Sequence, residues 1–176
     1  GFSASEVRLI AEETVKTELR SAKTKRKLGR FMLPKGISFI HESLMLLRYL
    51  RKAGFQIWVI SGSNTWSVEA VLRRVHIPSD RIIGIDLVEV NQALSSTVKT
   101  PVPVLKGKVN ALKQRLRTRP EIVVSDSLYD IPLFNFSADT RVLVRPHKGS
   151  INKFFTAGRI TMDDSWFVIE RSSPLT

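Results

Sequence analysis

Short apolar segments alternate with amphipathic helical patterns along this chain, and that alternation limits its fold more than any other feature. The apolar segments are rich in Val, Ile and aromatic residues, as buried strands are; they begin at Phe55 (FQIWVI), Arg81 (RIIGIDL), Glu121 (EIVVS), Arg141 (RVLVR) and Trp166 (WFVI). Strands that alternate with helices predict a mainly parallel sheet with helices on both faces. We therefore expect an α/β protein built as a Rossmann-like, three-layer α/β/α sandwich.

The helical segments are recognised by apolar residues at three- and four-residue spacing and by their start and stop signals. The first is capped by Ser3 or Ser5 and is expected to continue to Lys27, with acids early and bases late. The others are expected near 37–47, 68–75, 107–117, 128–134 and 150–156. From residue 37 onward, helices and strands thus follow one another as a parallel sheet requires.

Composition excludes several classes of protein. The 176 residues are 43% hydrophobic, which suffices for one core of ordinary domain size, and the absence of cysteine excludes disulfides, thiolate metal sites and a cysteine nucleophile. No apolar run reaches the roughly 18 residues that cross a bilayer. The first residues do not follow the signal-peptide pattern of basic, then apolar, then small residues. We expect a soluble protein of the cytoplasm.

The net charge of +12 favours partners or substrates that carry negative charge. The excess is concentrated in Lys23–Arg30 and Lys106–Arg119. Neither segment is interleaved with the aromatic residues on which single-stranded nucleic acid stacks. We therefore favour a solvated basic surface over a nucleic-acid partner.

Polar residues follow two of the predicted strands. Ser61 comes after QIWVI, Asp126 comes after EIVVS, and Asp130 lies four residues further on. Because the carboxyl ends of parallel strands meet at one edge of a sheet, we expect Ser61 and Asp126 to lie close together there. The simpler interpretation is that these residues cap helices: Ser63 or Asn64 the one, Asp126 with Ser127 the other.

Four segments together resemble motifs of the haloacid dehalogenase superfamily. They are GFQIWVISGSN, VLRRVHIPSDRIIGIDL, LKGKVNAL and IVVSDSLYDIPLF, in the order of motifs II, III and IV. The similarity covers residues 34–166 and is greatest to the phosphoserine-phosphatase-like and phosphocholine-phosphatase-like branch. The resemblance implies the Rossmann-like core of that superfamily and a phosphoaspartyl mechanism.

The resemblance also implies how phosphate would be bound. Ser61, with the backbone amides of Gly62 and Ser63, would bind phosphate oxygens at a turn from strand to helix. A lysine would add positive charge beside the phosphate. Lys108 and Lys106 both fit this role, and the Gly-Lys-apolar form of the motif favours Lys108.

The acids of IVVSDSLYD would form part of a metal site by the same resemblance. Asp126 would bind Mg²⁺, a cation that prefers carboxylate oxygen, and Asp130 would orient the coordination shell or bind through water. Ser125 stands where the superfamily usually has glycine. Both acids and the phosphate-binding residues would take part in catalysis.

One motif of the superfamily is missing. Its members begin with a strand ending in Asp-x-Asp, which supplies the nucleophile and the general acid–base, and no Asp-x-Asp occurs in this chain. The resemblance therefore implies that residues 1–33 are a remnant of a helical cap, and that residues 34–176 are a core whose first strand is absent from this sequence.

The sequence predicts a Mg²⁺-dependent phosphomonoester hydrolase of a small phosphorylated metabolite, phosphoserine- or phosphocholine-like. Without the Asp-x-Asp motif, the chain alone is expected to be inactive. The alternative is a non-catalytic relative that kept the fold as a basic scaffold or an RNA-associated subunit.

Overall fold

The structure is a computed structural model that describes residues 1–21, 24–144, 156, 161 and 163–170. The chain folds into two units: Gly1–Phe39 with Ser61–Lys99, and Ile40–Ile60 with Thr100–Thr176. None of the described helices is both long and apolar enough to cross a bilayer. The predicted division into a cap of residues 1–33 and a core of residues 34–176 stays a prediction.

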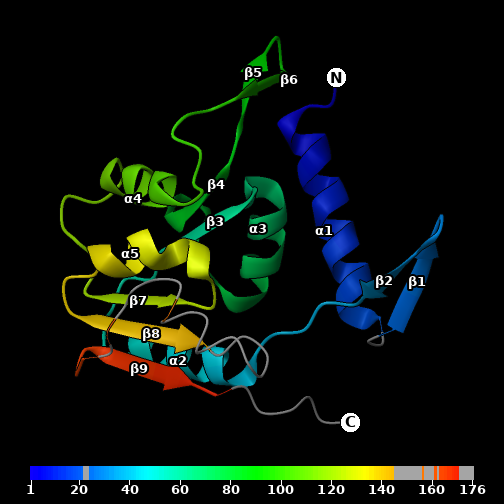
Figure 1. Cartoon of the computed structure of the whole chain (residues 1–176). Coiled ribbons are helices and arrows are strands. Elements are labelled where there is room, and N and C mark those ends of the chain that lie inside the picture. The colour runs from blue at the N-terminus through cyan, green and yellow to red at the C-terminus, as the bar shows by residue number, and fades with distance from the viewer. Residues whose placement is uncertain (22–23, 145–155, 157–160, 162, 171–176) are drawn as a thin grey trace. The chain divides into compact units, whose positions relative to one another are not determined.

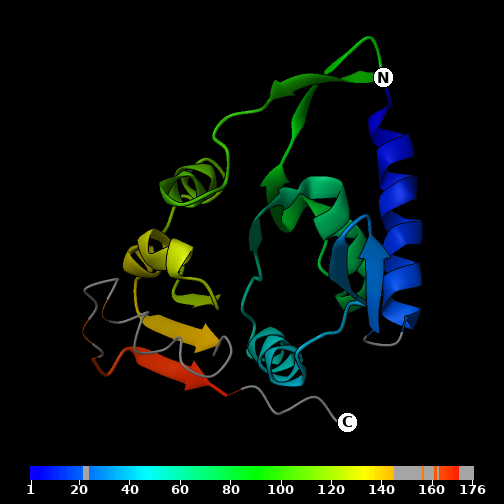
Figure 2. The same cartoon turned by 45° about the vertical axis from the view of Figure 1, so that its right-hand side comes forward.

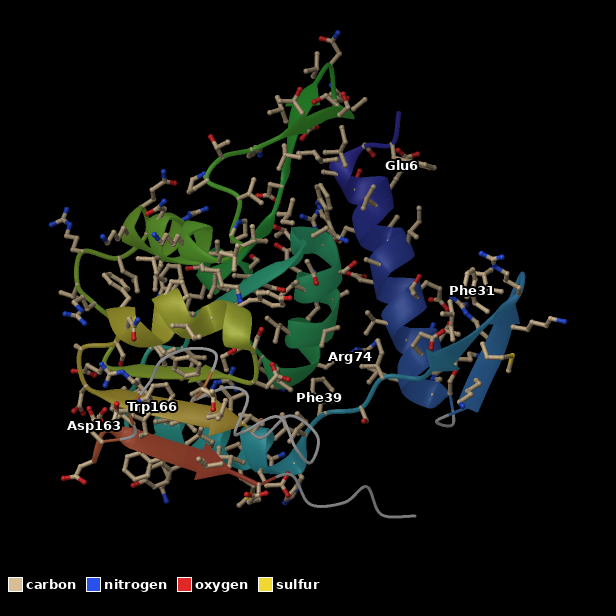
Figure 3. All side chains as sticks on the ribbon, in the orientation of Figure 1. Glu6, Phe31, Phe39, Arg74, Asp163 and Trp166 are labelled. Atoms are coloured by element: carbon tan, nitrogen blue, oxygen red, sulfur yellow. The ribbon has the colours of Figure 1, made fainter. Side chains whose placement is uncertain are left out.

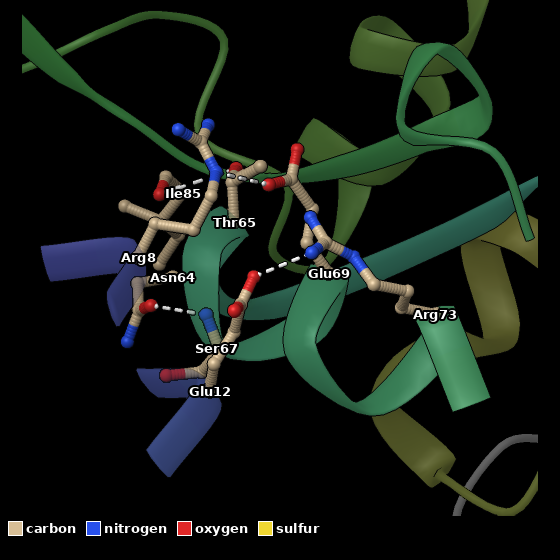
Figure 4. A network of polar contacts seen from close by, with 8 residues as sticks. All are labelled: Arg8, Glu12, Asn64, Thr65, Ser67, Glu69, Arg73 and Ile85. Atoms are coloured by element: carbon tan, nitrogen blue, oxygen red, sulfur yellow. Dashed lines mark hydrogen bonds and ion pairs between the residues drawn. The ribbon is translucent and has the colours of Figure 1, made fainter. Parts of the chain in front are cut away.

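The first unit is built on the contact between helices α1 (Ala4–Arg20) and α3 (Thr65–Leu72). Their buried residues form one apolar cluster: Ala11, Val15, Trp66 and Ala70. Two ion pairs lie outside the cluster: Arg8 on α1 with Glu69 on α3 at 3.2 Å, and Glu12 on α1 with Arg73, the residue directly after α3, at 2.7 Å (Figure 4). These pairs are partly exposed, so the apolar contact contributes most to the packing.

Helix α1 ends earlier than the sequence predicts. Beyond Arg20 the chain forms the antiparallel strands β1 (Thr24–Leu28) and β2 (Phe31–Lys35), so the predicted helix to Lys27 is wrong over its last residues. The hydroxyl of Ser21 donates to the carbonyl of Thr17 at 2.9 Å and terminates the helix. Gly29, at φ 59°, makes the two-residue turn that the hairpin needs. Figure 1 shows this hairpin as β1 and β2.

The remaining strands of the first unit lie between Ser61 and Val98, and the first of them, β3, begins two residues earlier, at the end of the segment Ile40–Ile60. They are β3 (Val59–Asn64), β4 (Ile82–Ile85), β5 (Leu87–Val90) and β6 (Ala93–Val98), with single 3₁₀ turns at Arg73–Val75 and Ser79–Arg81. β3 pairs with β4, and β5 pairs with β6 in an antiparallel hairpin that was not predicted from the sequence. Asn91 and Gln92 both have positive φ in its turn, without the glycine that usually marks such hairpins.

The second unit contains the parallel sheet. Its elements are α2 (His41–Lys52), α4 (Lys106–Lys113), β7 (Ile122–Ser125), a 3₁₀ turn η3 (Leu128–Asp130), α5 (Ile131–Phe136), β8 (Thr140–Val144) and β9 (Trp166–Ile169). β7, β8 and β9 pair in parallel in that order, which confirms the predicted α/β class. The predicted helix near 150–156 lies outside the described residues, apart from Thr156.

The core of the second unit lies where α5 packs on this sheet. The rings of Phe134 on α5 and Trp166 on β9 are 5.0 Å apart between centroids. Figure 3 labels Trp166 on β9. The guanidinium of Arg119 donates to the carbonyls of residues 135–137 and so satisfies the free end of α5. These contacts fix the end of α5 that leads into β8.

The capping box of α1 allows a test of the first unit. The Ser3 backbone N–H and hydroxyl each donate to the Glu6 carboxylate at 2.8 Å, and the Glu6 N–H donates back to Ser3 Oγ at 3.2 Å. The backbone hydrogen bond, with the hydroxyl second, holds the pKa of Glu6 below its ordinary value of 4.5. We expect Ser3→Ala to lower the free energy of unfolding by about 1 kcal/mol at neutral pH.

Because the folded-state pKa of Glu6 is lowered, its contribution is present above pH 4.5 and is lost as the pH falls through the folded value. The stability difference between wild type and Glu6→Gln should therefore shrink on acidification, as measured by urea unfolding across this range. A difference that stays constant with pH would contradict the role of the Glu6 charge.

Candidate functional site

The two acids of the predicted metal site, Asp126 and Asp130, lie at the carboxyl end of β7. β7 ends at Ser125, Asp126 follows directly, and the single turn η3 brings Asp130 back to the strand end. Asp126 is exposed, whereas Asp130 is buried. The two carboxylates therefore lie in different environments and cannot play the same part.

Asp130 forms a buried ion pair with Lys108. The Lys108 Nζ atom lies 2.6 Å from Asp130 Oδ1, and the two side chains are only 13% and 6% exposed. Among the described residues, no group donates a hydrogen bond of normal geometry to Oδ1. The interaction with Lys108 is therefore an ion pair, as its short distance shows. Nearly buried ions are costly unless paired, and here each is the other's partner.

Ser125 holds the second oxygen of Asp130. Its hydroxyl donates to Oδ2 at 2.6 Å and accepts from the N–H of Ser127 at 3.2 Å. Asp130 is thus fixed from two sides. The sequence predicts Ser125 only as a departure from glycine and carries no signal for this bond, because the bond depends on the turn that brings Asp130 back to the strand end.

The two candidate lysines differ in position on α4. Lys108 lies on the side of the helix that faces Asp130, whereas Lys106 is exposed. Lys106 instead lines a shallow cavity of about 250 Å³ between α4 and α5, together with Val109, Asn110, Pro132, Asn135 and Phe136. The geometry favours Lys108 as the lysine that acts together with the acids.

Gly107 explains why glycine precedes that lysine. A side chain at this position would collide with the backbone carbonyl of Val102. Only glycine therefore lets the first turn of α4 approach the preceding loop so closely. Glycine thus precedes Lys108 for a steric reason. The close contact between Gly107 and the loop before α4 helps to set the position of Lys108.

Ser61, Gly62 and Ser63 lie within β3 instead of forming a separate turn, because β3 starts four residues later than the apolar segment that predicted it. The helix that follows is capped by Asn64, whose Oδ1 accepts from the N–H of Ser67 at 2.9 Å (Figure 4). Ser61 Oγ accepts from the N–H of Ser63 at 3.1 Å. These residues belong to the first unit, and their predicted approach to Asp126 stays a prediction.

The described residues fit a magnesium site only in part. Both oxygens of Asp130 are already engaged by Lys108 and Ser125, so Asp130 fits the orienting role better than that of a direct ligand. Asp126 is an exposed carboxylate of the kind that Mg²⁺ prefers. Within the part of the chain that the structure describes, no group of three or more His, Asp or Glu could hold a metal ion.

Substituting the two lysines separately tests their different surroundings. Lys108→Met leaves the buried carboxylate of Asp130 without its counter-ion, so we expect the free energy of unfolding to fall by about 3 kcal/mol. Lys106→Met is the matched control and should change it by less than about 0.5 kcal/mol. Urea unfolding of both variants and of Lys108→Met/Asp130→Asn measures this. Equal effects of the two single substitutions would contradict the ion pair, as would a double variant no more stable than Lys108→Met.

Comparison with solved structures shows two similar folds. A conserved, functionally unknown protein from Anaerococcus prevotii DSM 20548 superimposes with a TM-score of 0.73 and 17% identity over 90% of this chain and 48% of its own. A protein of unknown function from Bordetella pertussis Tohama I gives 0.69 and 17% identity, over 96% and 67%. This chain thus spans about half the length of the first. At this identity the likeness shows the fold alone.

A third solved structure is less similar. A phosphoserine phosphohydrolase-like protein from Francisella tularensis subsp. tularensis SCHU S4 gives a TM-score of 0.47 and 15% identity over 60% of this chain and 50% of its own, too low to support an inference. No curated protein matches the chain significantly.

One family model matches most of the sequence. The model of the haloacid dehalogenase-like hydrolases matches residues 4–135, which is 132 of the 176 residues. The matched range includes α4, β7 and the Lys108, Ser125 and Asp130 cluster at the end of β7. The resemblance seen in the sequence is confirmed: this chain belongs to the haloacid dehalogenase-like hydrolase family.

Proposed function

We propose that this chain forms the phosphate-binding and metal-binding part of a Mg²⁺-dependent phosphomonoesterase that acts on a small phosphorylated metabolite, phosphoserine- or phosphocholine-like. The observation that carries the proposal is the nearly buried ion pair of Lys108 and Asp130 at the carboxyl end of β7. The membership in a hydrolase family supports it. Ligands of α/β proteins bind at such strand ends.

The ion pair is better explained by a function than by stability. Taking two ions out of water costs several kcal/mol, and apolar residues of similar volume often stabilise a core equally well or better. Lys108, held by Asp130, offers a fixed ammonium that does not have to be reorganised when an anion arrives. Such fixed charges stabilise transition states more than mobile ones do.

The other groups have roles that follow from the family. Ser61 and the backbone amides of Gly62 and Ser63 bind phosphate oxygens in this proposal, and Asp126 binds Mg²⁺. When bound, Mg²⁺ neutralises charge on the phosphoryl group and orients it. Asp130 keeps Lys108 in place, and Ser125 keeps Asp130 in place.

The nucleophile is not among these residues. The 176 residues contain no Asp-x-Asp, so the chain by itself has no acid pair with which to form a phosphoaspartate. The same fact, with the net charge of +12, favours the second candidate function. That candidate is a non-catalytic, basic scaffold that binds RNA or a larger assembly.

Phosphate release from an aryl phosphate tests the missing nucleophile. We expect the purified chain 1–176 to release none above background with Mg²⁺, because its remaining groups bind phosphate but cannot attack it. Mg²⁺-dependent release by this chain would contradict that and would require another nucleophile.

The residues are tested in the natural gene product that contains this sequence, assayed on a panel of small phosphate esters. We expect Asp126→Asn to abolish the Mg²⁺ dependence and Lys108→Met to lower kcat/KM by about 100-fold or more, with Lys106→Met as the nearly unchanged control. Circular dichroism confirms that each variant is folded.

Two results would count against the proposal. A fully active Asp126→Asn variant would remove Asp126 from the mechanism. A wild type that is inactive on the whole panel would favour the scaffold.

A further inference from the structure

The β1–β2 hairpin carries chemistry that the proposed phosphatase does not use. From Leu19 to His41 the chain has seven Lys and Arg and no Asp or Glu. Five of these cations belong to the hairpin: Lys25, Arg26, Lys27, Arg30 and Lys35. All except Lys35 are exposed.

The hairpin is also unusually apolar for an exposed element. Leu28, Phe31 and Met32 are each 58% exposed, and Leu33 is 37% exposed. Monomeric proteins rarely gather large apolar side chains at one exposed place without a partner for them.

The strand register puts the two kinds of side chain together. Arg26 lies opposite Leu33, Lys27 lies opposite Met32, and Leu28 lies opposite Phe31 next to the turn. The first strand is therefore mainly cationic, the second mainly apolar, and the tip is an aliphatic–aromatic pair. Figure 3 labels Phe31 on this hairpin.

Nothing among the described residues neutralises these cations. No ion pair joins Lys25, Arg26, Lys27 or Arg30 to a carboxylate in the part of the chain that the structure describes. The Arg30 guanidinium lies over the ring of Phe31, 5.2 Å from the ring centroid. This contact with an uncharged ring leaves the positive charge of Arg30 in place.

The base of the hairpin is fixed while its strands contact mainly each other. The N–H of Gly36 donates to the Glu18 carboxylate at 2.7 Å, and the N–H of Ile37 donates to the Glu18 carbonyl at 3.1 Å. Both bonds hold the exit of β2 to the end of α1. Figure 2 shows the hairpin beside that helix. The hairpin is therefore anchored to α1 at its base, and its tip extends away from these bonds.

We propose that this hairpin docks the protein on an anionic lipid bilayer, as a binding function independent of the phosphatase site. Lys25, Arg26 and Lys27 pair with acidic headgroups, and Leu28 and Phe31 enter the boundary between headgroups and acyl chains. Cations flanking an apolar edge are what an interfacial anchor needs. RNA would use the cations but would leave the exposed Leu28 and Met32 in water.

Co-sedimentation of the chain 1–176 with phosphatidylcholine vesicles, with and without phosphatidylserine, tests the proposal. We expect binding only with phosphatidylserine, and binding that weakens as salt is added. Lys25→Gln/Lys27→Gln should lower the partition coefficient about 30-fold, since each cation near such a surface contributes roughly fivefold. Leu28→Thr/Phe31→Thr, which keeps the charge and the strand propensity, should lower it at least about tenfold.

Arg115→Gln/Arg117→Gln is the matched control, because it removes the same charge from exposed positions outside the hairpin. It should bind vesicles within about threefold of wild type, and all variants should keep the wild-type circular dichroism. The same variants are titrated with fluorescent polyuridine.

Three outcomes would overturn the proposal: equal loss in the control and in Lys25→Gln/Lys27→Gln, no effect of Leu28→Thr/Phe31→Thr, or tight polyuridine binding without vesicle binding.

Discussion

The ion pair of Lys108 and Asp130 is the interaction on which the geometry of the candidate site depends. The two charged atoms are 2.6 Å apart and almost excluded from water, so neither side chain can move away without leaving a buried charge behind. The pair joins α4 to the turn before α5. Because Ser125 at the end of β7 also holds Asp130, a helix, a strand and a turn are tied to one carboxylate.

The first unit is stabilised differently. Its helices α1 and α3 meet through an apolar cluster around Trp66, and their ion pairs lie at the edge of that cluster, where water screens them. The β1–β2 hairpin contributes little to this core. A two-stranded hairpin is only marginally stable by itself, so the bonds from Gly36 and Ile37 to Glu18 are needed to hold it.

This division separates two kinds of chemistry in the chain. In the second unit Lys108 is paired with Asp130 and nearly buried, as a site for a small anion requires, whereas the hairpin leaves its charges exposed beside apolar side chains. A net charge of +12 by itself did not distinguish these uses. The two uses differ in the surroundings of the cations: Lys108 pairs with a carboxylate within the fold, whereas the cations of the hairpin are exposed to water.

The sequence by itself determined the α/β class, the parallel strands β7, β8 and β9, the helices α2 and α3, and the family, because periodicity and local motifs depend on neighbouring residues alone. It favoured Lys108 over Lys106 without deciding between them, extended α1 into β1, and missed the β5–β6 turn at Asn91 and Gln92. Lys and Arg favour helices, but this preference is small, and here the turn at Gly29 and the pairing of β1 with β2 override it. Only the tertiary structure shows that Lys108 is the one of the two that pairs with Asp130, because burial and the approach of a carboxylate from another segment are not encoded in the local sequence of a lysine.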